Sequence, residues 1–407
     1  GYINKFAFFE GCCAKGFDGS VDKLTKSWAD VDQELKKDKD FGRQLSKKSL
    51  VKNILPESIK SISDELDKAK AIYEFVLDNY KWNGKSERYD VSVKDLVKEK
   101  SGSVFEINML LENLLTNEGY NIYPILISTR GNGLATKIYP ILTDFNYLIL
   151  RISIKGKDYY IDATEPYLSF GELPYRCLNQ YGRLIDFEEG SYWEDIEVKE
   201  YSSRIHRVEL NSFTEKGFGG IIESKSSRYH SHSLKRMYKE NPSLYKENKV
   251  NKYADISITK HDVSKLGKDS VDFEEKIQFT LEPELIGEKI YLNPFILKFF
   301  EENPFKLQER TYPIDFGYKD VYTYILSIDL GKNLSIIEIP SSVNYTLPNK
   351  GGSFLFNVEN KENKLTLYFK VRFDKAIYAP ELYNYLKKFM NSVVETQKNA
   401  LIVLEKN

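Results

Sequence analysis

GSVFEINMLLENLL, residues 102–115, is the stretch that decides the fold of the first half of this chain. Ser103 is a favourable helix N-cap, and Glu106 three residues later completes a capping box, in which each side chain accepts the other residue's backbone N–H. Gly119 then supplies a helix stop. Between them an apolar stripe runs at helical spacing through Val104, Ile107, Leu110, Leu111, Leu114 and Leu115. The pattern predicts a buried central helix.

The flanking segments predict an α+β domain. Before the central helix, residues 61–80 carry an apolar face at helical spacing, and the sequence Trp-Asn-Gly at 82–84 ends that helix. After it come YPILIST, FNYLILRISI and KDYYIDA, which are rich in β-branched and aromatic residues. The turn at 155–157 joins the last two strands as a hairpin. One core helix followed by an antiparallel sheet is typical of the α+β class.

Beyond residue 200 the hydrophobic period changes to two. Alternating apolar residues occur at 271–279, 322–330 and 365–373, separated by turn residues, and this predicts a β-sandwich. Pro380 suits the first position of a final amphipathic helix, which we expect to pack on this sheet. Its predicted apolar face comprises Leu382, Tyr385, Leu386, Phe389 and Val393.

Length and composition indicate a globular protein of two or three domains. The chain has 407 residues, of which 41% are apolar and 29% are charged. We expect an N-terminal lead-in at 1–60, an α+β domain at 61–200, and a β-sandwich domain with its C-terminal helix at 201–407. The lead-in opens with the strand-like INKFAFF and contains a helix start framed by Ser27 and Asp30.

Charge argues against nucleic acid as a partner, and hydropathy argues against a transmembrane segment. Lys plus Arg number 59 and Asp plus Glu number 60, so the net charge of −1 gives no field that would favour nucleic acid. No apolar run approaches the roughly 20 residues needed to cross a bilayer, which predicts no transmembrane segment in this chain. The N-terminus also lacks the pattern of an export signal.

The start of the central helix is a suitable place for a reactive cysteine. Helix-terminal amides and the helix dipole stabilise a thiolate there, and a nearby His and carboxylate would complete a cysteine hydrolase or acyl transferase. The hairpin brings position 147 roughly opposite 162–164, where side chains can meet across the two strands. The sequence therefore builds the scaffold of such a site, although Val104 stands in the first helical turn.

Residues 65–200 resemble the transglutaminase-like superfamily, which has a papain-like core. More narrowly, the chain resembles a multidomain Gram-negative envelope family in which that core lies between β-rich domains. The motifs that carry the resemblance are SGSVFEINMLLENLL, YPILISTRGNG, FNYLILRISIKGKDYYIDAT and LPYRCLNQYGRLI, followed by NPFKLQERTYPIDFGY and APELYNYLKKF. The resemblance implies a periplasmic or outer-membrane-associated protein. It also implies that the opening residues end an upstream β domain, so that this chain is a fragment.

The resemblance places a degenerate catalytic triad in this chain. In active members the nucleophilic Cys stands at the place of Val104, the His at Tyr147 and the carboxylate at Asp162, and only the last is kept. Valine has no nucleophilic atom, and a tyrosine with an ordinary pKa of about 10 is a poor general base near neutrality. Loss of a triad nucleophile costs on the order of a million-fold in rate. We therefore predict no catalytic residues of this type.

Other residues offer weaker alternatives for chemistry. Cys177 is interpreted as a buried small hydrophobic residue, because no His lies near it in sequence. The His230–His232 pair lacks a third metal ligand at a recognisable spacing, so we predict no metal and no cofactor. The spacing of the three cysteines does not reveal the redox state of Cys12 and Cys13.

Residues around the triad positions are predicted to line a remnant cleft. These are Trp82, Ser103 and Asn146, with core packing as the equal alternative for Trp82 and Tyr147. We favour a structural role for Asp162, which would accept hydrogen bonds from Tyr147 or from backbone, over contact with a ligand.

The interpretation favoured by the sequence is an inactive transglutaminase-like protein that binds a protein or peptide partner, or acts as a scaffold, in a bacterial envelope. One alternative is a thiol-dependent peptidase or acyl transferase that uses Cys177, or another chemistry that reuses Asp162. The other is a structural subunit whose sheet edges or Tyr-rich faces dock a larger assembly.

Overall fold

The computed structural model describes residues 13–15, 21–23, 26–211, 213–253, 255–268 and 270–407. The strand predicted at 3–9 and Cys12 lie outside these residues. The chain divides into two compact units: the first is Gly1–Pro166 with Phe170–Ile196, and the second is Tyr167–Ser169 with Glu197–Asn407. Each unit is described separately below. Within the described residues, none of the helices is both long and apolar enough to span a bilayer.

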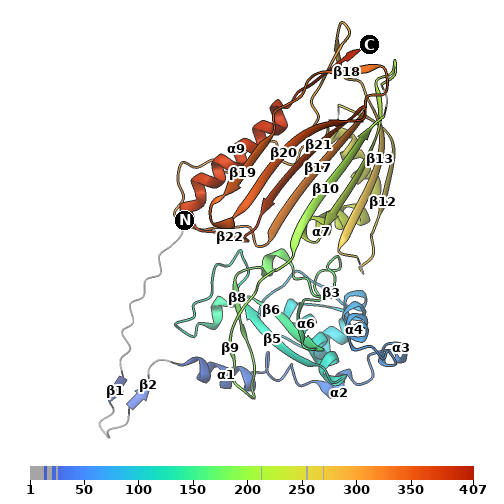
Figure 1. Cartoon of the computed structure of the whole chain (residues 1–407). Coiled ribbons are helices and arrows are strands. Elements are labelled where there is room, and N and C mark those ends of the chain that lie inside the picture. The colour runs from blue at the N-terminus through green and yellow to red at the C-terminus, as the bar shows by residue number, and fades with distance from the viewer. Residues whose placement is uncertain (1–12, 16–20, 24–25, 212, 254, 269) are drawn as a thin grey trace. The chain divides into compact units, whose positions relative to one another are not determined.

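The first unit has a five-stranded antiparallel sheet in the order β7-β6-β5-β8-β9 (Figure 1). Its strands are β5 (Asn121–Ile127), β6 (Tyr147–Ile154), β7 (Lys157–Ile161), β8 (Tyr181–Leu184) and β9 (Tyr192–Asp195). Its helices are α1 (Trp28–Lys37), α2 (Lys48–Val51), α3 (Glu57–Lys60), α4 (Glu65–Asn79), α5 (Val93–Glu99) and α6 (Val104–Asn117). Short strand pairs are β1 (Cys13–Lys15) with β2 (Val21–Lys23), and β3 (Lys81–Trp82) with β4 (Ser101–Gly102). The predicted α+β class is confirmed.

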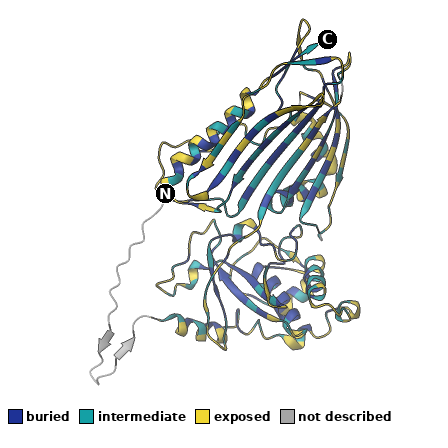
Figure 2. Cartoon of the chain, in the orientation of Figure 1, coloured by how far each residue is buried: buried dark blue, intermediate teal, exposed yellow. Residues whose placement is uncertain are grey.

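Helix α6 is the buried central helix predicted from its capping box. The Ser103 hydroxyl accepts the Glu106 N–H and the Glu106 carboxylate accepts the Ser103 N–H, so two backbone donors at the helix start are satisfied. Gly119 ends the helix with a φ of 88°, which an L side chain rarely adopts. Residues 104–115 are buried except Glu106 (Figure 2), and the helix contacts α2, α4, α5, β5 and β6.

The predicted hairpin is also present and fixes the register of the site. Lys155 and Gly156 both have positive φ, as a two-residue β-hairpin turn requires. Leu150 pairs with Ile161 in β6–β7, so the continued register directs Tyr147 toward Thr164. The capping box predicted at Ser27 and Asp30 is likewise confirmed at the start of α1.

The second unit is built on one eight-stranded sheet in the order β12-β13-β11-β10-β17-β21-β20-β19. All pairs are antiparallel except β10 with β17. The strands are β10 (Tyr201–Leu210), β11 (Phe218–Ser227), β12 (Ser257–Ser264), β13 (Asp272–Leu281), β17 (Lys319–Asp329), β19 (Val343–Leu347), β20 (Gly352–Lys361) and β21 (Lys364–Phe373). The period-two pattern predicted for β13, β17 and β21 places one face of each strand in the core.

The layer that covers this sheet differs from the facing sheet of the predicted β-sandwich. The apolar face packs against α9 (Tyr383–Asn399), an irregular segment around Phe295, and strands of a four-stranded sheet. That smaller sheet has the order β14-β15-β23-β18, formed by β14 (Glu284–Ile286), β15 (Lys289–Leu292), β18 (Leu334–Glu338) and β23 (Ile402–Lys406). The remaining elements are α7 (Tyr229–Glu240), α8 (Pro242–Lys252), β16 (Ile314–Asp315) and β22 (Ile377–Tyr378). Alternation in the sequence predicted the covered face, and the predicted packing of the last helix on this sheet is confirmed, whereas the irregular segment around Phe295 was not predicted.

The apolar face of the last helix is rotated from its predicted position. Leu386, Phe389 and Val393 are buried as predicted, but Tyr385 is 49% exposed and Tyr383 is buried instead. Met390, Val394 and Gln397 are buried on the same side of α9, so Tyr385, which lies about 100° around the helix from Leu386, falls outside the buried face.

Candidate functional site

Val104 lies at the first position of α6 and has no exposed surface. Its backbone N–H, which at a helix start is available to stabilise a thiolate or an oxyanion, donates instead to the Lys85 carbonyl at 3.1 Å. The side chain and the amide at this position are therefore both occupied by protein packing.

Tyr147 and Asp162 meet across the hairpin as the register predicted. The Tyr147 hydroxyl donates to Asp162 Oδ2 at 2.8 Å, while Asn108 Nδ2 and the Thr164 N–H each donate to Oδ1 at 3.0 Å. Asp162 has no exposed surface and Tyr147 is 1% exposed. The structural role predicted for Asp162 matches this geometry, because a buried carboxylate is stable only when its oxygens are hydrogen-bonded.

Arg176 closes the network on its outer side. Its Nη2 donates to the Tyr147 hydroxyl and to Thr164 Oγ1, both at 2.8 Å, and Nη1 forms an ion pair with Glu165 at 3.4 Å. The guanidinium also lies over the Trp82 ring, 4.5 Å from its centroid. Arg176 thus occupies the space above Tyr147 with a fixed cation.

The electrostatics of this network oppose base catalysis by Tyr147. Burial raises the pKa of Tyr147 well above its ordinary value, and the Asp162 charge raises it further. A phenol in that state keeps its proton and donates it to the carboxylate in a hydrogen bond. It cannot accept a proton from a nucleophile near neutral pH.

Cys177 lies beside the network but has no exposed surface. Burial raises the pKa of its thiol well above the ordinary value, and Asp162 adds to that shift. A reactive cysteine needs an accessible thiolate, and both conditions are absent at this position. The geometry matches the interpretation of Cys177 as a packed small residue.

The three residues predicted to line a cleft have different surroundings. Trp82 is half-buried, donates its indole N–H to the Lys85 carbonyl at 2.8 Å and packs on Arg176. Ser103 caps α6. Asn146 exchanges hydrogen bonds with Thr129, accepting its N–H and donating to its hydroxyl, both at 2.9 Å. Of these three side chains, Trp82 is the one that contacts the Tyr147–Arg176 cluster, through the face of its ring.

The four histidines lie in the second unit, where each contacts different residues. His230 Nε2 lies 2.7 Å from Asp320 and His261 Nε2 lies 3.0 Å from Glu275, while the His206 ring stacks on Phe299. Within the part of the chain that the structure describes, no group of three or more His, Cys, Asp or Glu is arranged to hold a metal ion.

Sequence reasoning missed three members of the buried network: Asn108, Thr164 and Arg176. A signal was present for Asn108, which interrupts the apolar stripe of α6 and uses its side chain to bond Asp162, the Leu148 carbonyl and the Ala163 N–H. Arg176 stands next to Cys177 in sequence but gave no periodic signal, because it lies in the short 3-10 turn Tyr175–Cys177.

Comparison with known proteins gives distant likenesses only. Residues 288–403 match the model of a domain of unknown function with solved structure, DUF3858. No curated protein matches the chain. A crystal structure of a "putative protease" from Parabacteroides distasonis is similar with a TM-score of 0.49 and 11% identity over 93% of this chain, which spans 57% of that protein's chain. A "putative cysteine protease" from Cytophaga hutchinsonii has a TM-score of 0.26 and 13% identity, over 42% of this chain and 55% of its own.

Proposed function

We propose that this chain is a non-catalytic transglutaminase-like protein that acts as a binding or scaffolding component of a bacterial cell envelope. One observation carries the non-catalytic part: Tyr147 and Asp162 are buried and hydrogen-bonded to each other, and Val104 has no exposed surface. The envelope location rests on the resemblance of the sequence to a Gram-negative envelope family. The binding or scaffolding role is inferred by elimination, because the fold is intact while the catalytic residues are absent.

The network supports this proposal because it replaces catalytic groups with structural ones. A cysteine hydrolase needs a nucleophile at position 104, but Val104 is a buried apolar side chain. It needs a base at position 147, but the Tyr147 hydroxyl is protonated and donates to Asp162. Arg176 then neutralises the carboxylate side of the network and excludes a substrate atom from the Tyr147 hydroxyl. Tyr147 thus donates to Asp162 and accepts from Arg176, which holds these three side chains together.

A thiol-reactive probe tests the absence of a cysteine nucleophile. Native protein should be labelled at Cys177 no faster than background, because the thiol is buried and its pKa is raised. Peptide mapping by mass spectrometry is needed to separate Cys177 from Cys12 and Cys13. The Cys177→Ala variant is the control, and rapid labelling of the native protein at Cys177 would refute the proposal.

Restoring only the missing thiol should not restore reactivity. We expect a cysteine introduced by Val104→Cys to react on the order of 100-fold more slowly than one introduced by Ser58→Cys, because position 104 has no exposed surface and Ser58 is exposed. The measurement is the labelling rate of each new thiol in folded protein, mapped by mass spectrometry. Comparable rates would mean that the site opens to solvent, and they would contradict a closed network.

The location is tested by fractionating cells that make the natural protein. Recovery of the chain with periplasmic or outer-membrane markers is the expected result. Recovery with cytosolic markers would reject the envelope role while leaving the non-catalytic assignment intact, since the two are measured separately.

A further inference from the structure

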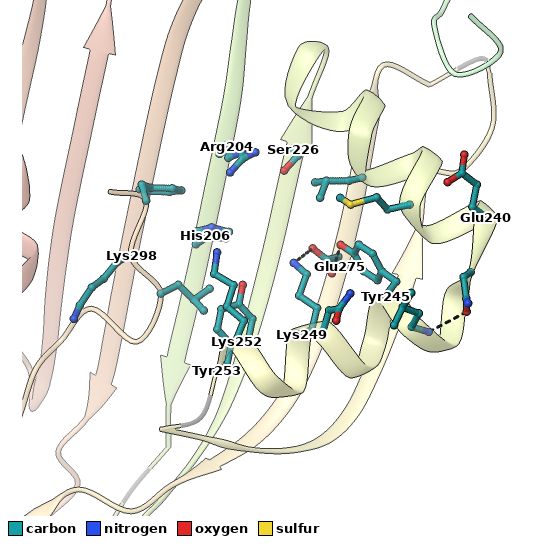
Figure 3. A pocket seen from close by; sticks show the side chains of 17 residues that line it. Arg204, His206, Ser226, Glu240, Tyr245, Lys249, Lys252, Tyr253, Glu275 and Lys298 are labelled. Atoms are coloured by element: carbon teal, nitrogen blue, oxygen red, sulfur yellow. Dashed lines mark hydrogen bonds and ion pairs between the residues drawn. The ribbon is translucent and has the colours of Figure 1, made fainter. Parts of the chain in front are cut away.

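A cavity of about 470 Å³ lies in the second unit between the large sheet and helices α7 and α8 (Figure 3). Side chains from β10, β11 and β13 form its floor, and the two helices and the segment 297–299 form its walls. This volume falls within the range of small-molecule binding sites. The cavity is separate from the buried network of the first unit.

The strand register gathers polar side chains on the floor of the cavity. Arg204 pairs with Ser226 across β10–β11, and His206 pairs with Ser224, which in turn pairs with Glu275 across β11–β13. Farther along β10 the same face becomes apolar and joins the core. Burying polar side chains on the inner face of a sheet costs free energy unless they form hydrogen bonds or ion pairs.

Glu275 is already satisfied by neighbouring side chains. Its carboxylate accepts hydrogen bonds from Tyr245, Lys249 and His261 at 2.9–3.0 Å (Figure 3 shows the first two). Burial alone would raise the pKa of Glu275, but hydrogen bonds from His261 and Lys249 hold it at about 2. Glu275 is therefore ionised and matched by Lys249, which leaves it no role as the counter-ion of Arg204.

Arg204 has no hydrogen-bond or ion-pair partner among the residues that the structure describes. Its Nε is buried and unbonded, and its guanidinium lies on the cavity floor (Figure 3). The cavity is lined by four cationic side chains, Arg204, Lys249, Lys252 and Lys298, but by only two carboxylates, Glu240 and Glu275. The lining thus has an excess of two positive charges, and one of them is a guanidinium whose buried Nε lacks an acceptor.

The walls of the cavity offer apolar and aromatic surface beside this cation. Phe299 stacks on the His206 ring with centroids 4.8 Å apart. Burial lowers the pKa of His206 to about 3, so the ring is neutral near pH 7 and adds no charge. Leu244 and Met237 line the cavity and are 49% and 48% exposed, so both offer apolar surface to a ligand.

We propose that this cavity binds an amphipathic organic carboxylate, with the carboxylate on Arg204 and the apolar body against Phe299 and Leu244. A planar guanidinium matches the two oxygens of a carboxylate, and the apolar walls supply the contact that a simple inorganic anion lacks. This inference concerns the second unit and does not depend on the loss of catalysis in the first.

The test is calorimetric titration of the whole chain with matched probes. Phenylbutyrate supplies both the carboxylate and the apolar body, phenylbutyramide removes the charge, and acetate removes the body. We expect phenylbutyrate to bind at least tenfold more tightly than either, in titrations that reach about 10 mM because a ligand of this size binds weakly. Phenyl phosphate, as a fourth probe, should bind less tightly than phenylbutyrate.

Variants link the binding to the cavity. Arg204→Gln should weaken phenylbutyrate binding at least tenfold, whereas Arg207→Gln should not change it, because Arg207 is an exposed residue on the same strand. Leu244→Trp should also weaken binding at least tenfold by filling the cavity from a half-exposed position. This second variant decides the question if Arg204→Gln fails to fold.

Several results would overturn the proposal. Equal binding of phenylbutyrate and its amide would remove the role of the cation, and tighter binding of phenyl phosphate would remove the carboxylate assignment. Wild-type affinity in folded Arg204→Gln, or in Leu244→Trp, would place any binding elsewhere. Absence of phenylbutyrate binding at the highest concentration would reject the site.

Discussion

Asp162→Ala should lower the free energy of unfolding of the first unit by about 3–5 kcal/mol. The substitution removes a buried carboxylate that accepts from Tyr147, Asn108 and the Thr164 N–H. Each of these donors would lose its acceptor without access to water, and Arg176 would lose the nearby negative charge. The effect is large because one side chain satisfies several groups at once.

Urea unfolding followed by tryptophan fluorescence measures this effect in the first unit alone. The three tryptophans of the chain, Trp28, Trp82 and Trp193, all lie in that unit. Asp195→Ala is the matched control, because Asp195 is exposed and its substitution should change the free energy of unfolding by less than about 0.5 kcal/mol. A loss below about 1 kcal/mol for Asp162→Ala would show that the network contributes little to stability.

Glu112→Gln should remove a loss of stability that the wild-type protein suffers as the pH rises. Glu112 lies buried on α6, and its Oε2 has no hydrogen-bond partner among the described residues. Burial raises its pKa to about 8, against the opposing effects of Thr116 and Lys48. An unfolded chain would release this proton near pH 4.5.

The sign of the pH dependence follows from the proton count. Between pH 5 and pH 8 the folded state keeps the Glu112 proton that the unfolded state has lost, so stability falls as the pH rises through this window. The loss attributable to Glu112 is on the order of 3 kcal/mol.

Urea titrations at several pH values measure this contribution. The gap between Glu112→Gln and wild type should widen with pH, whereas Glu99→Gln, at an exposed site on α5, should follow wild type. Parallel curves for Glu112→Gln and wild type would contradict a raised pKa.

Some corrections arise because short-range patterns do not report distant partners. The sequence identified the inward face of α9 at Leu386, Phe389 and Val393, but it assigned Tyr385 to that face although the side chain is exposed. It identified the alternating faces of β13, β17 and β21 and the helix that packs on the sheet, but it did not predict the irregular segment around Phe295 that covers the sheet beside them. That segment has no periodic pattern from which its packing could be predicted.

The sequence by itself determined the features that depend on neighbours within a few residues or across one turn. The capping box at Ser103 and Glu106, the stop at Gly119 and the turn at Lys155–Gly156 are of this kind, because their hydrogen bonds and φ angles are local. The sequence also determines that Val104, the first residue of α6, has no nucleophilic atom.

Only the tertiary structure determined which side chains surround the start of α6 and where the chain has a cavity. Arg176 reaches Tyr147 across 29 residues of sequence, and Lys249 reaches Glu275 across 26. Glu275, a carboxylate beside Arg204 in the cavity lining, is paired with Lys249 instead. Such contacts depend on which surfaces are buried together, and burial sets both the cost of an unpaired charge and the strength of a paired one.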